Sequence, residues 1–335
     1  MKIFEIGEFG LISHIREWVK EKNPEVFRGV GDDTAVLSLS KYKYLLYTCD
    51  TQVEGIHFLL SFTTPYLLGR KSMAINISDI ASMGGTPSFA LISLILPQET
   101  ELSFLGELYR GLVEEGNKWG VTIVGGNISR TNGPLTVDIS LLGEVKKRHL
   151  KLRSGAKKGD LILVTGYPGR SAAGLKLLQV NKSKDFSELT SAYLSPTPRL
   201  REALIIASFP EVSSMIDVSD GVLQDLGHIL KESSVGATIR EESLPINESL
   251  RKSAEVLGEE AINLFLNGGE DYELIFTVSP DNSEKIIKKV KKETGTDLSL
   301  IGEINDHFPN ISLVTQSRDK INLKAKGWDH FKDIE

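Results

Sequence analysis

The sequence has a single cysteine, Cys49, among 335 residues, and no apolar run that approaches the roughly 20 residues needed to cross a bilayer. One cysteine excludes an internal disulfide framework and suits a reducing compartment, so we expect a cytoplasmic protein. The opening segment, MKIFEIGEFGLISHI, lacks the apolar core and the small-residue cleavage site of a signal peptide. These absences predict a protein without a membrane partner.

An excess of basic residues is also missing. The chain has 39 Lys and Arg against 45 Asp and Glu, a formal net charge of −6, so we expect no nucleic-acid partner. Its contents of 40% hydrophobic and 25% charged residues are ordinary for a globular protein. The length favours two domains, each large enough to bury a core of its own.

Expected strands and helices alternate along the chain, which indicates an α/β protein. A basic, glycine-containing stretch at 146–160, KKRHLKLRSGAKKGD, interrupts this alternation. We therefore predict an N-terminal domain over 1–147 and a C-terminal domain over 148–335. The expected strands cover 34–39, 42–50, 88–97, 121–127, 135–145, 160–166, 213–221, 271–278 and 298–304, and the expected helices cover 65–83, 101–120, 170–179, 222–232 and 283–293.

A carboxylate, Asp79, falls within an expected helix whose other residues are mostly Leu, Ile, Ala and Met. Ser72, Asn76 and Asp79 are spaced i, i+4 and i+7, so they share one narrow polar stripe of that helix. An ionised aspartate is seldom buried without a partner, and a stripe of oxygen-bearing side chains without Lys or Arg suits a hard cation. The alternative is a stripe that faces solvent.

Further aspartates follow apolar strands or stand beside glycine: Asp33 in GVGDDTAVL, Asp50 in YTCDTQVEG, and Asp217 and Asp220 in IDVSDG. Taken alone, Asp33 is typical of a turn and Asp220 of a helix N-cap. If they converge, two carboxylates 4 Å apart repel by about 4 kcal/mol at an effective dielectric near 20, so a cluster needs protons or divalent cations. Oxygen ligands without a Cys/His cluster favour Mg²⁺ or Mn²⁺ over zinc.

Glycine-rich loops offer the closely approaching backbone N–H groups that phosphates need, as in GVGDD, MGGTP, VGGN, SDG and NGGED. The sequence lacks GxxxxGK[ST], the HRD and DFG motifs of protein kinases, and a GxGxxG that opens a helix after a strand. The residues alone therefore predict a magnesium-dependent phosphoryl-transfer or nucleotide-binding protein that holds its nucleotide by a less common device.

An ordered set of motifs runs from end to end of the chain: EFGLI, GVGDDTAVL, TCDTQVEGIHF, AINISDIASMGG, IVGGN, LRSGAKKGD, IDVSDG, GGEDYEL and KGWDHF. The set resembles the thiamine-monophosphate kinase family, within the superfamily of aminoimidazole ribonucleotide synthetase and selenophosphate synthetase. The resemblance implies direct in-line transfer of the ATP γ-phosphoryl to thiamine phosphate, assisted by several magnesium ions, with thiamine diphosphate and ADP as products.

The resemblance also implies a two-domain synthetase-like α/β fold. The N-terminal α/β domain would pair with that of a second copy into a barrel across the axis of a homodimer. The C-terminal α/β sandwich domain would complete a cleft for ATP and thiamine phosphate. Continuous apolar strands such as FALISLIL are compatible with such pairing.

The motifs carry the site residues of the family onto this chain. The implied metal ligands are Asp33, Thr48, Cys49, Asp50, Asp79, Asn127, Asp217 and Asp220. The implied ATP contacts are Gly126, Asn127, Arg153 and Ser219. The implied thiamine phosphate contacts are His57, Glu270 and Trp328, whose alternative interpretations are a packed loop histidine, a turn glutamate and a C-terminal plug.

Three positions depart from the usual pattern of the family. Asn127 replaces a common Asp, which keeps an oxygen ligand but loses a charge. Cys49 stands where Ser or Thr is usual, so it would contribute its backbone carbonyl rather than a hydroxyl. Arg170, in PGRSAAG, replaces a common Asp and argues against a metal role for that loop.

The acceptor in such a reaction is a phosphate oxygen that is already largely ionised at neutral pH. We therefore predict no general base and assign the carboxylates to metal ions. Two other functions stay open: an ATP-dependent synthetase like aminoimidazole ribonucleotide synthetase, and a non-catalytic ATP or magnesium sensor with the same fold. The motifs GGEDYELIF and KGWDHF favour the thiamine enzyme over the synthetase.

Overall fold

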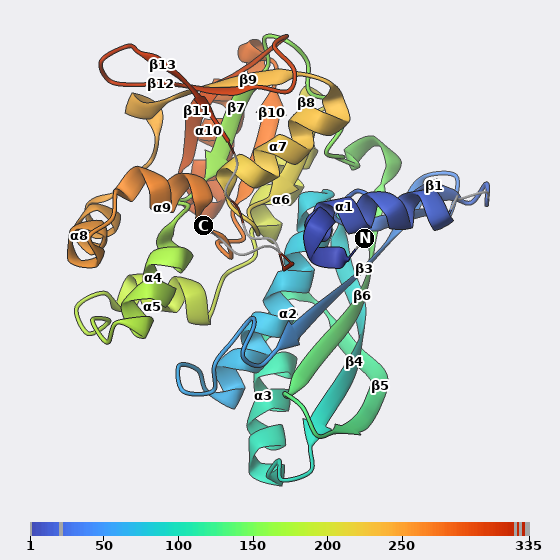
Figure 1. Cartoon of the computed structure of the whole chain (residues 1–335). Coiled ribbons are helices and arrows are strands. Elements are labelled where there is room, and N and C mark those ends of the chain that lie inside the picture. The colour runs from blue at the N-terminus through green and yellow to red at the C-terminus, as the bar shows by residue number, and fades with distance from the viewer. Residues whose placement is uncertain (1, 20–22, 325–326, 328–329, 332–335) are drawn as a thin grey trace.

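The computed structural model describes residues 2–19, 23–324, 327 and 330–331, and the strands of this part of the chain form two sheets (Figure 1). The N-terminal sheet is six-stranded, in the order β1-β2-β3-β6-β4-β5. The C-terminal sheet is seven-stranded, in the order β13-β12-β9-β11-β7-β10-β8. None of the described helices is long and apolar enough to cross a membrane.

The N-terminal half contains each predicted strand and helix and adds one helix and one strand, before residue 30, that the sequence did not predict. Its strands are β1 (Val26–Arg28), β2 (Ala35–Ser38), β3 (Lys43–Val53), β4 (Thr86–Pro97), β5 (Thr122–Thr131) and β6 (Thr136–Lys146). Its helices are α1 (Ile3–Val19), α2 (Pro65–Ser82) and α3 (Leu102–Trp119). The strand predicted over 121–127 continues to Thr131, because its parallel ladder with β4 runs on until the Asn-Gly-Pro turn at 132–134.

The C-terminal half contains the second sheet and most of the helices. Its strands are β7 (Leu161–Thr165), β8 (Val212–Asp217), β9 (Gly236–Arg240), β10 (Leu274–Val278), β11 (Leu298–Asn305), β12 (Ile311–Val314) and β13 (Lys320–Leu323). Its helices are α4 (Arg170–Gln179), α5 (Ser187–Leu194), α6 (Leu200–Ala207), α7 (Val222–Ser233), α8 (Glu248–Leu257), α9 (Ala261–Asn267) and α10 (Pro280–Thr294).

Helix α2 lies between the two sheets (Figure 1) and packs against β3 and β6 on one side and against β8 and α6 on the other. Thr64 begins it as N-cap, with Oγ1 accepting the N–H of Leu67 at 3.2 Å, and Pro65 occupies the first turn. The helix approaches α3 very closely, because a Cβ added at Gly111 would stand 2.0 Å from the carbonyl oxygen of Tyr66. Most of α2 is buried as a result.

Strand β3 presents two different surfaces. Successive side chains of a strand point to opposite faces, and here Leu46 and Thr48 are buried towards α2, whereas Tyr47 and Cys49 are exposed on the other face. Asp50 is paired in register with Ile139 of β6, which is fully buried, so the carboxylate lies on the α2 side of the sheet. We call the opposite surface of the N-terminal sheet, which carries Tyr47 and Cys49, the outer face.

Candidate metal and nucleotide site

A cleft of about 1280 Å³ lies between the two halves. α1, β3 and α2 line it from the N-terminal half, and α4, α7 and the loop at 267–272 line it from the C-terminal half. Its walls include the predicted site residues Asp33, Thr48, Cys49, Asp50, His57, Asp79, Arg153, Asp217, Ser219, Asp220 and Glu270. Gly126 and Asn127 are not among the lining residues, and Trp328 lies outside the described residues.

Two hydroxyls of α2 hold predicted metal ligands in place. Ser78 Oγ donates to Asp217 Oδ2 at 2.5 Å, and Ser82 Oγ donates to Asp33 Oδ2 at 2.5 Å. Ser78 and Ser82 are one helical turn apart, on either side of Asp79, so a single helix contacts acids from both halves of the chain. Sequence reasoning missed both serines, although their i, i+4 spacing around Asp79 was a visible signal.

The polar stripe predicted on α2 faces the cleft and β3 rather than bulk solvent. Asp79 is half-buried in the cleft wall, and its Oδ2 accepts a hydrogen bond from Thr48 Oγ1 at 2.5 Å. Asn76 Oδ1 accepts the backbone N–H of Asp50 at 3.2 Å, and Asn76 Nδ2 donates to the carbonyl of Ser72 at 3.0 Å. Strand β3 therefore holds the side chain of Asp79 through Thr48, and α2 holds the backbone of Asp50 through Asn76.

Asp33, Asp50, Asp79 and Asp217 are close enough to repel one another. Burial first, and then the charges of Asp138 and Asp33, raise the pKa of Asp50 to about 6. Burial, followed mainly by Asp33, raises the pKa of Asp217 to about 8. The pKa of Asp79 is raised well above its usual value by burial and then by the other three carboxylates. Divalent cations bound by these oxygens would offset the repulsion, so the donor set fits magnesium.

Arg153 places a positive charge at the edge of this acid cluster. Its Nε and Nη2 donate to Asp33 Oδ1 at 2.9 and 2.5 Å, and its backbone N–H donates to Asp32 Oδ1 at 2.9 Å. Arg28 Nε donates to the second oxygen of Asp32 at 2.9 Å. Asp33 is therefore more than a turn residue, since it joins the cluster to the segment that links the two sheets.

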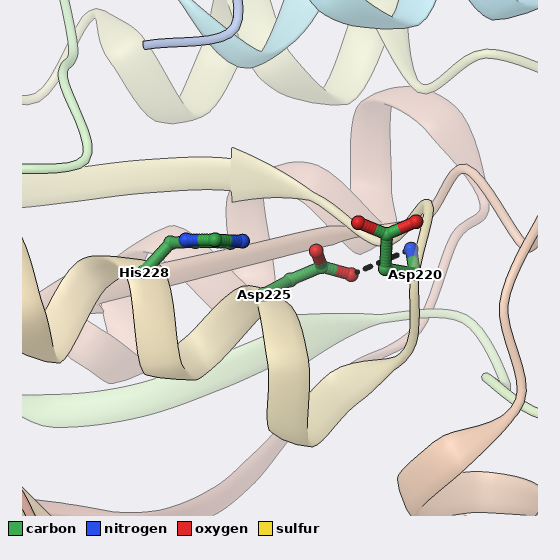
Figure 2. Close-up of side chains that lie close together, drawn as sticks. All are labelled: Asp220, Asp225 and His228. Carbon is green, nitrogen blue, oxygen red and sulfur yellow. Dashed lines mark hydrogen bonds between the residues drawn. The ribbon is translucent and has the colours of Figure 1, made fainter. Parts of the chain in front are cut away.

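A second group lies beside the acid cluster, where ligand atoms of Asp220, Asp225 and His228 all lie within 4.8 Å of one another (Figure 2). Asp225 and His228 are one turn apart on α7, and Asp220 lies in the loop that precedes this helix. Asp225 is 1% exposed, and its Oδ2 accepts the backbone N–H groups of residues 219–221 at 3.1, 3.1 and 3.0 Å. The buried carboxylate thereby shapes the loop that carries Ser219 and Asp220.

This arrangement corrects two expectations. The N-cap of α7 is Gly221, so Asp220 is not the N-cap, and its side chain lies in the cleft wall. The strand predicted over 213–221 ends at Asp217. The backbone N–H groups of residues 219–221 donate to the Asp225 carboxylate, so they are not available to pair with a neighbouring strand. Burial, followed by nearby positive charge, lowers the pKa of His228 to about 3, so its ring is neutral and able to ligate a cation.

The side chains of Cys49 and Asn127 are directed to the outer face, away from the acid cluster, although Cys49 also lines the cleft. Cys49 Sγ is 3.4 Å from Asp138 Oδ2 on the outer face, and burial raises the pKa of its thiol. Thr51 Oγ1 donates to the same carboxylate at 2.6 Å. Asn127 pairs in register with Ser93, which pairs with Asp138, so these residues form one polar row across the outer face. Sequence reasoning did not identify Asp138. The alternation of its strand predicts only that Asp138 lies on the face opposite to Val137 and Ile139, not which residues lie beside it.

His57 lies near the first half of α2. Its Nδ1 accepts the backbone N–H of Val53 at 3.1 Å. Burial, and then the charges of His330 and Lys71, lower the pKa of His57 to about 4, so the neutral ring carries its proton on Nε2 and can donate it to a ligand. The His330 ring is 4.9 Å from that of His57, which makes it a cleft residue that sequence reasoning missed within KGWDHF.

Glu270 lies in the loop at 267–272 and has a φ of 63°, a left-handed conformation that is uncommon for residues other than glycine. Its N–H donates to the carbonyl of Ser219 at 2.7 Å, so the loop is tied to the segment before α7. Arg170 is placed elsewhere: Nη1 donates to Glu188 at 3.1 Å, and the residue does not line the cleft.

Comparison with known proteins agrees with this geometry. The chain matches the AIR synthase related protein family, with its N-terminal domain over residues 31–145 and its C-terminal domain over residues 157–311. It is 36% identical to thiamine-monophosphate kinase of Buchnera aphidicola (subsp. Schizaphis graminum) over 331 residues, covering 98% of this chain and 99% of the relative. The same identity holds with thiamine-monophosphate kinase of Escherichia coli K12, over 97% of this chain and 98% of the relative.

A solved structure described as "AaThiL complexed with AMPPCP and TMP" superposes with a TM-score of 0.85 at 32% identity, over 98% of this chain and 99% of that one. These matches extend over both sheets and the cleft between them. The mixed α/β architecture with two domains of this family, expected from the motifs, is confirmed. The chain belongs to the AIR synthase related proteins and, within them, to the thiamine-monophosphate kinase family.

Proposed function

We propose that this chain transfers the γ-phosphoryl group of ATP to thiamine phosphate, giving thiamine diphosphate and ADP. Support comes from its thiamine-monophosphate kinase relatives and from the related structure described with AMPPCP and TMP. The observation on this chain that carries the proposal is the gathering of four aspartates around α2, with Arg153 beside them, in a cleft between two sheets. A synthetase reaction and a non-catalytic sensor are not favoured, because the relatives that match end to end bear the kinase name.

Within this proposal, the acid cluster would hold magnesium ions through Asp33, Asp50, Asp79 and Asp217, and Asp220 would hold a further ion with Asp225 and His228. Bound magnesium would neutralise phosphate charge and stabilise the transition state. Thr48 stays a prediction as a metal ligand, and its Oγ1 contacts Asp79 of this array. Cys49 and Asn127 stay predictions as metal ligands, since they lie on the outer face.

The residues around the cluster have roles in binding rather than in proton transfer. Arg153 and Ser219 would contact ATP, and Gly126 and Asn127, which do not line the cleft, stay predictions for the same role. His57 would donate its Nε2 proton in a hydrogen bond to thiamine phosphate, Glu270 would line the same pocket, and Trp328 stays a prediction. None of these groups needs to remove a proton from the acceptor, because a phosphate oxygen is already ionised at neutral pH.

The reaction is tested by incubating the chain with ATP, magnesium and thiamine phosphate and separating the products by chromatography. We expect thiamine diphosphate and ADP in a one-to-one ratio, and neither product in the absence of thiamine phosphate. ADP without thiamine diphosphate would indicate another acceptor, and an absence of turnover would favour a sensor. Either result would overturn the proposal.

The proposal includes a homodimer formed through the outer face. Tyr47, Leu142 and Phe89 form one register row across β3, β6 and β4, and Leu91 lies in the next row. Tyr47 is 42% exposed, Phe89 51% and Leu91 46%, so these rows present large apolar side chains on the outer face. The barrel that the resemblance implies would cover this surface with the same face of a second copy of the chain.

The proposal also places the boundary between the two domains at 147/148 and the enzyme in the cytoplasm.

Leu91→Glu is expected to weaken this association by about tenfold or more, because it places a charge in an apolar interface core. Sedimentation equilibrium measures the effect as a shift from dimer to monomer. Leu102→Glu is the matched control, since Leu102 is 84% exposed on α3, away from the outer face, and this change should leave the dimer intact. A monomeric unsubstituted chain, or a Leu91→Glu variant that dimerises normally, would contradict the proposed interface.

A further inference from the structure

Lys71 of α2 is a buried cation to which neither the motifs nor the proposed mechanism gives a role. The residue is 3% exposed, although lysine is among the residues least often buried. Its Nζ lies 2.6 Å from Glu270 Oε1 and 3.9 Å from the centroid of the Tyr193 ring. No acceptor among the described residues stands in hydrogen-bonding geometry to this Nζ, so the pair is held by charge and by the aromatic face.

The position of Lys71 relates it to the acid cluster. Lys71, Ile75 and Asp79 are spaced i, i+4 and i+8, so they follow one another along a single face of α2. Ile75 and Asp79 both line the cleft. At a rise of 1.5 Å per residue, the Cα atoms of Lys71 and Asp79 are about 12 Å apart along α2. The ion pair of Lys71 with Glu270 therefore lies about two helical turns from the acid cluster at Asp79.

The contacts of Lys71 join both sides of the proposed thiamine phosphate pocket. Glu270 belongs to the C-terminal half, whereas Lys71 belongs to the N-terminal half. Tyr193, on α5, donates through its hydroxyl to the carbonyl oxygen of His57 at 3.1 Å. One lysine therefore contacts the glutamate directly and the histidine through a tyrosine.

We propose that Lys71 is a positioning residue for thiamine phosphate recognition: it holds the carboxylate of Glu270 in the pocket and, through Tyr193, fixes the segment of His57. This inference rests on the proposed function, because it assigns Glu270 and His57 to the acceptor pocket. A carboxylate held by an ion pair in one orientation presents its second oxygen to a ligand at a lower entropic cost than a mobile one. In this role Lys71 acts through Glu270 and Tyr193 rather than by contact with the reacting phosphates.

Lys71→Met keeps the length and apolar stem of the side chain and removes its charge. We expect the Kd for thiamine phosphate, measured by isothermal titration calorimetry without ATP, to rise by about 10- to 100-fold. The KM for thiamine phosphate should rise in parallel, while the KM for ATP stays within about twofold. Lys71→Arg should restore part of the affinity, because it returns the positive charge.

The contribution of the ion pair is isolated by a double-mutant cycle. Glu270→Gln alone should weaken thiamine phosphate binding, and the double variant Lys71→Met/Glu270→Gln should bind no more weakly than the worse single variant. Lys252→Met is the matched control, since it removes an exposed ion pair with Glu248 on α8, and it should leave both KM values unchanged.

The outcomes separate this inference from the proposed function. If the unsubstituted chain does not bind thiamine phosphate, the proposed function fails first. If it binds and a folded Lys71→Met variant binds equally well, or loses affinity for ATP to the same extent, the positioning role of Lys71 is wrong. Thermal unfolding of each variant without ligand shows which of them are folded, and Lys71→Arg provides the comparison if Lys71→Met is not.

Discussion

Asp79→Asn is expected to lower kcat by about 10²- to 10³-fold, the range found when one preorganised electrostatic contact to a transition state is removed. Asp79 lies at the centre of the acid cluster, where Thr48 and the three neighbouring carboxylates surround it. Asparagine preserves the shape of the side chain but halves its oxygen donors and removes its charge. The loss of turnover should be largest at limiting magnesium.

The same substitution should stabilise the chain when no metal is present. Removing one carboxylate from the cluster lowers the electrostatic repulsion in the native state. We therefore expect the free energy of unfolding to rise by about 1 kcal/mol, which raises the Tm in chelator by about 2–4 °C. Steady-state kinetics across magnesium concentrations and thermal unfolding in chelator measure the two effects. Asp306→Asn, which alters an exposed ion pair with Lys158, is the control and should change neither. Wild-type turnover at limiting magnesium would refute the assignment of Asp79.

Removal of magnesium is expected to abolish turnover and to make stability depend on pH between pH 7 and 8. The pKa values of Asp217 and Asp79 are raised by burial and by neighbouring carboxylates, that of Asp217 to about 8. The native state therefore binds more protons than the unfolded state in this window, so the free energy of unfolding falls as the pH rises. In chelator we expect the Tm to drop by about 2–4 °C from pH 7 to pH 8.

Saturating magnesium should reverse this dependence. Cations bind the ionised carboxylates, and a ligand at 100 times its Kd stabilises the native state by about 2.7 kcal/mol per site. Differential scanning calorimetry at both pH values, with sodium chloride matched for ionic strength, separates binding from screening. The histidines with lowered pKa, His57 and His228, are neutral in the native state throughout this window. A Tm in chelator that is equal at pH 7 and pH 8, or higher at pH 8, would contradict the clustering.

The sequence predicted the alternation of strands and helices and the acids of the cleft. The stripe around Asp79 was visible because helical spacing is a local property, and the motifs supplied partners that are distant in sequence. Asp33, Asp79 and Asp217 come from three separate segments, and the structure brings them together in the cleft.

Residues whose role depends on a tertiary contact were missed. Ser78, Ser82 and Asp225 hold acids or loops through hydrogen bonds between segments, which no local pattern announces. Lys71 lies one residue before the predicted stripe of Ser72, Asn76 and Asp79, and its contacts with Glu270 and Tyr193 come from segments distant in sequence. The outer-face position of Asn127 follows from the order of strands in the sheet, which spacing along the chain does not determine.

The alternation of side chains in β3 makes the length of that strand as important as its composition. The side chains of Thr48 and Asp50 are directed towards α2, whereas those of Cys49 and Thr51 are directed to the outer face. Insertion or deletion of one residue in β3 ahead of position 48 would turn the cleft-facing side chains to the outer face and the outer-face side chains to the cleft. Both surfaces would lose their function at once. This strand should therefore tolerate single substitutions far better than insertions or deletions.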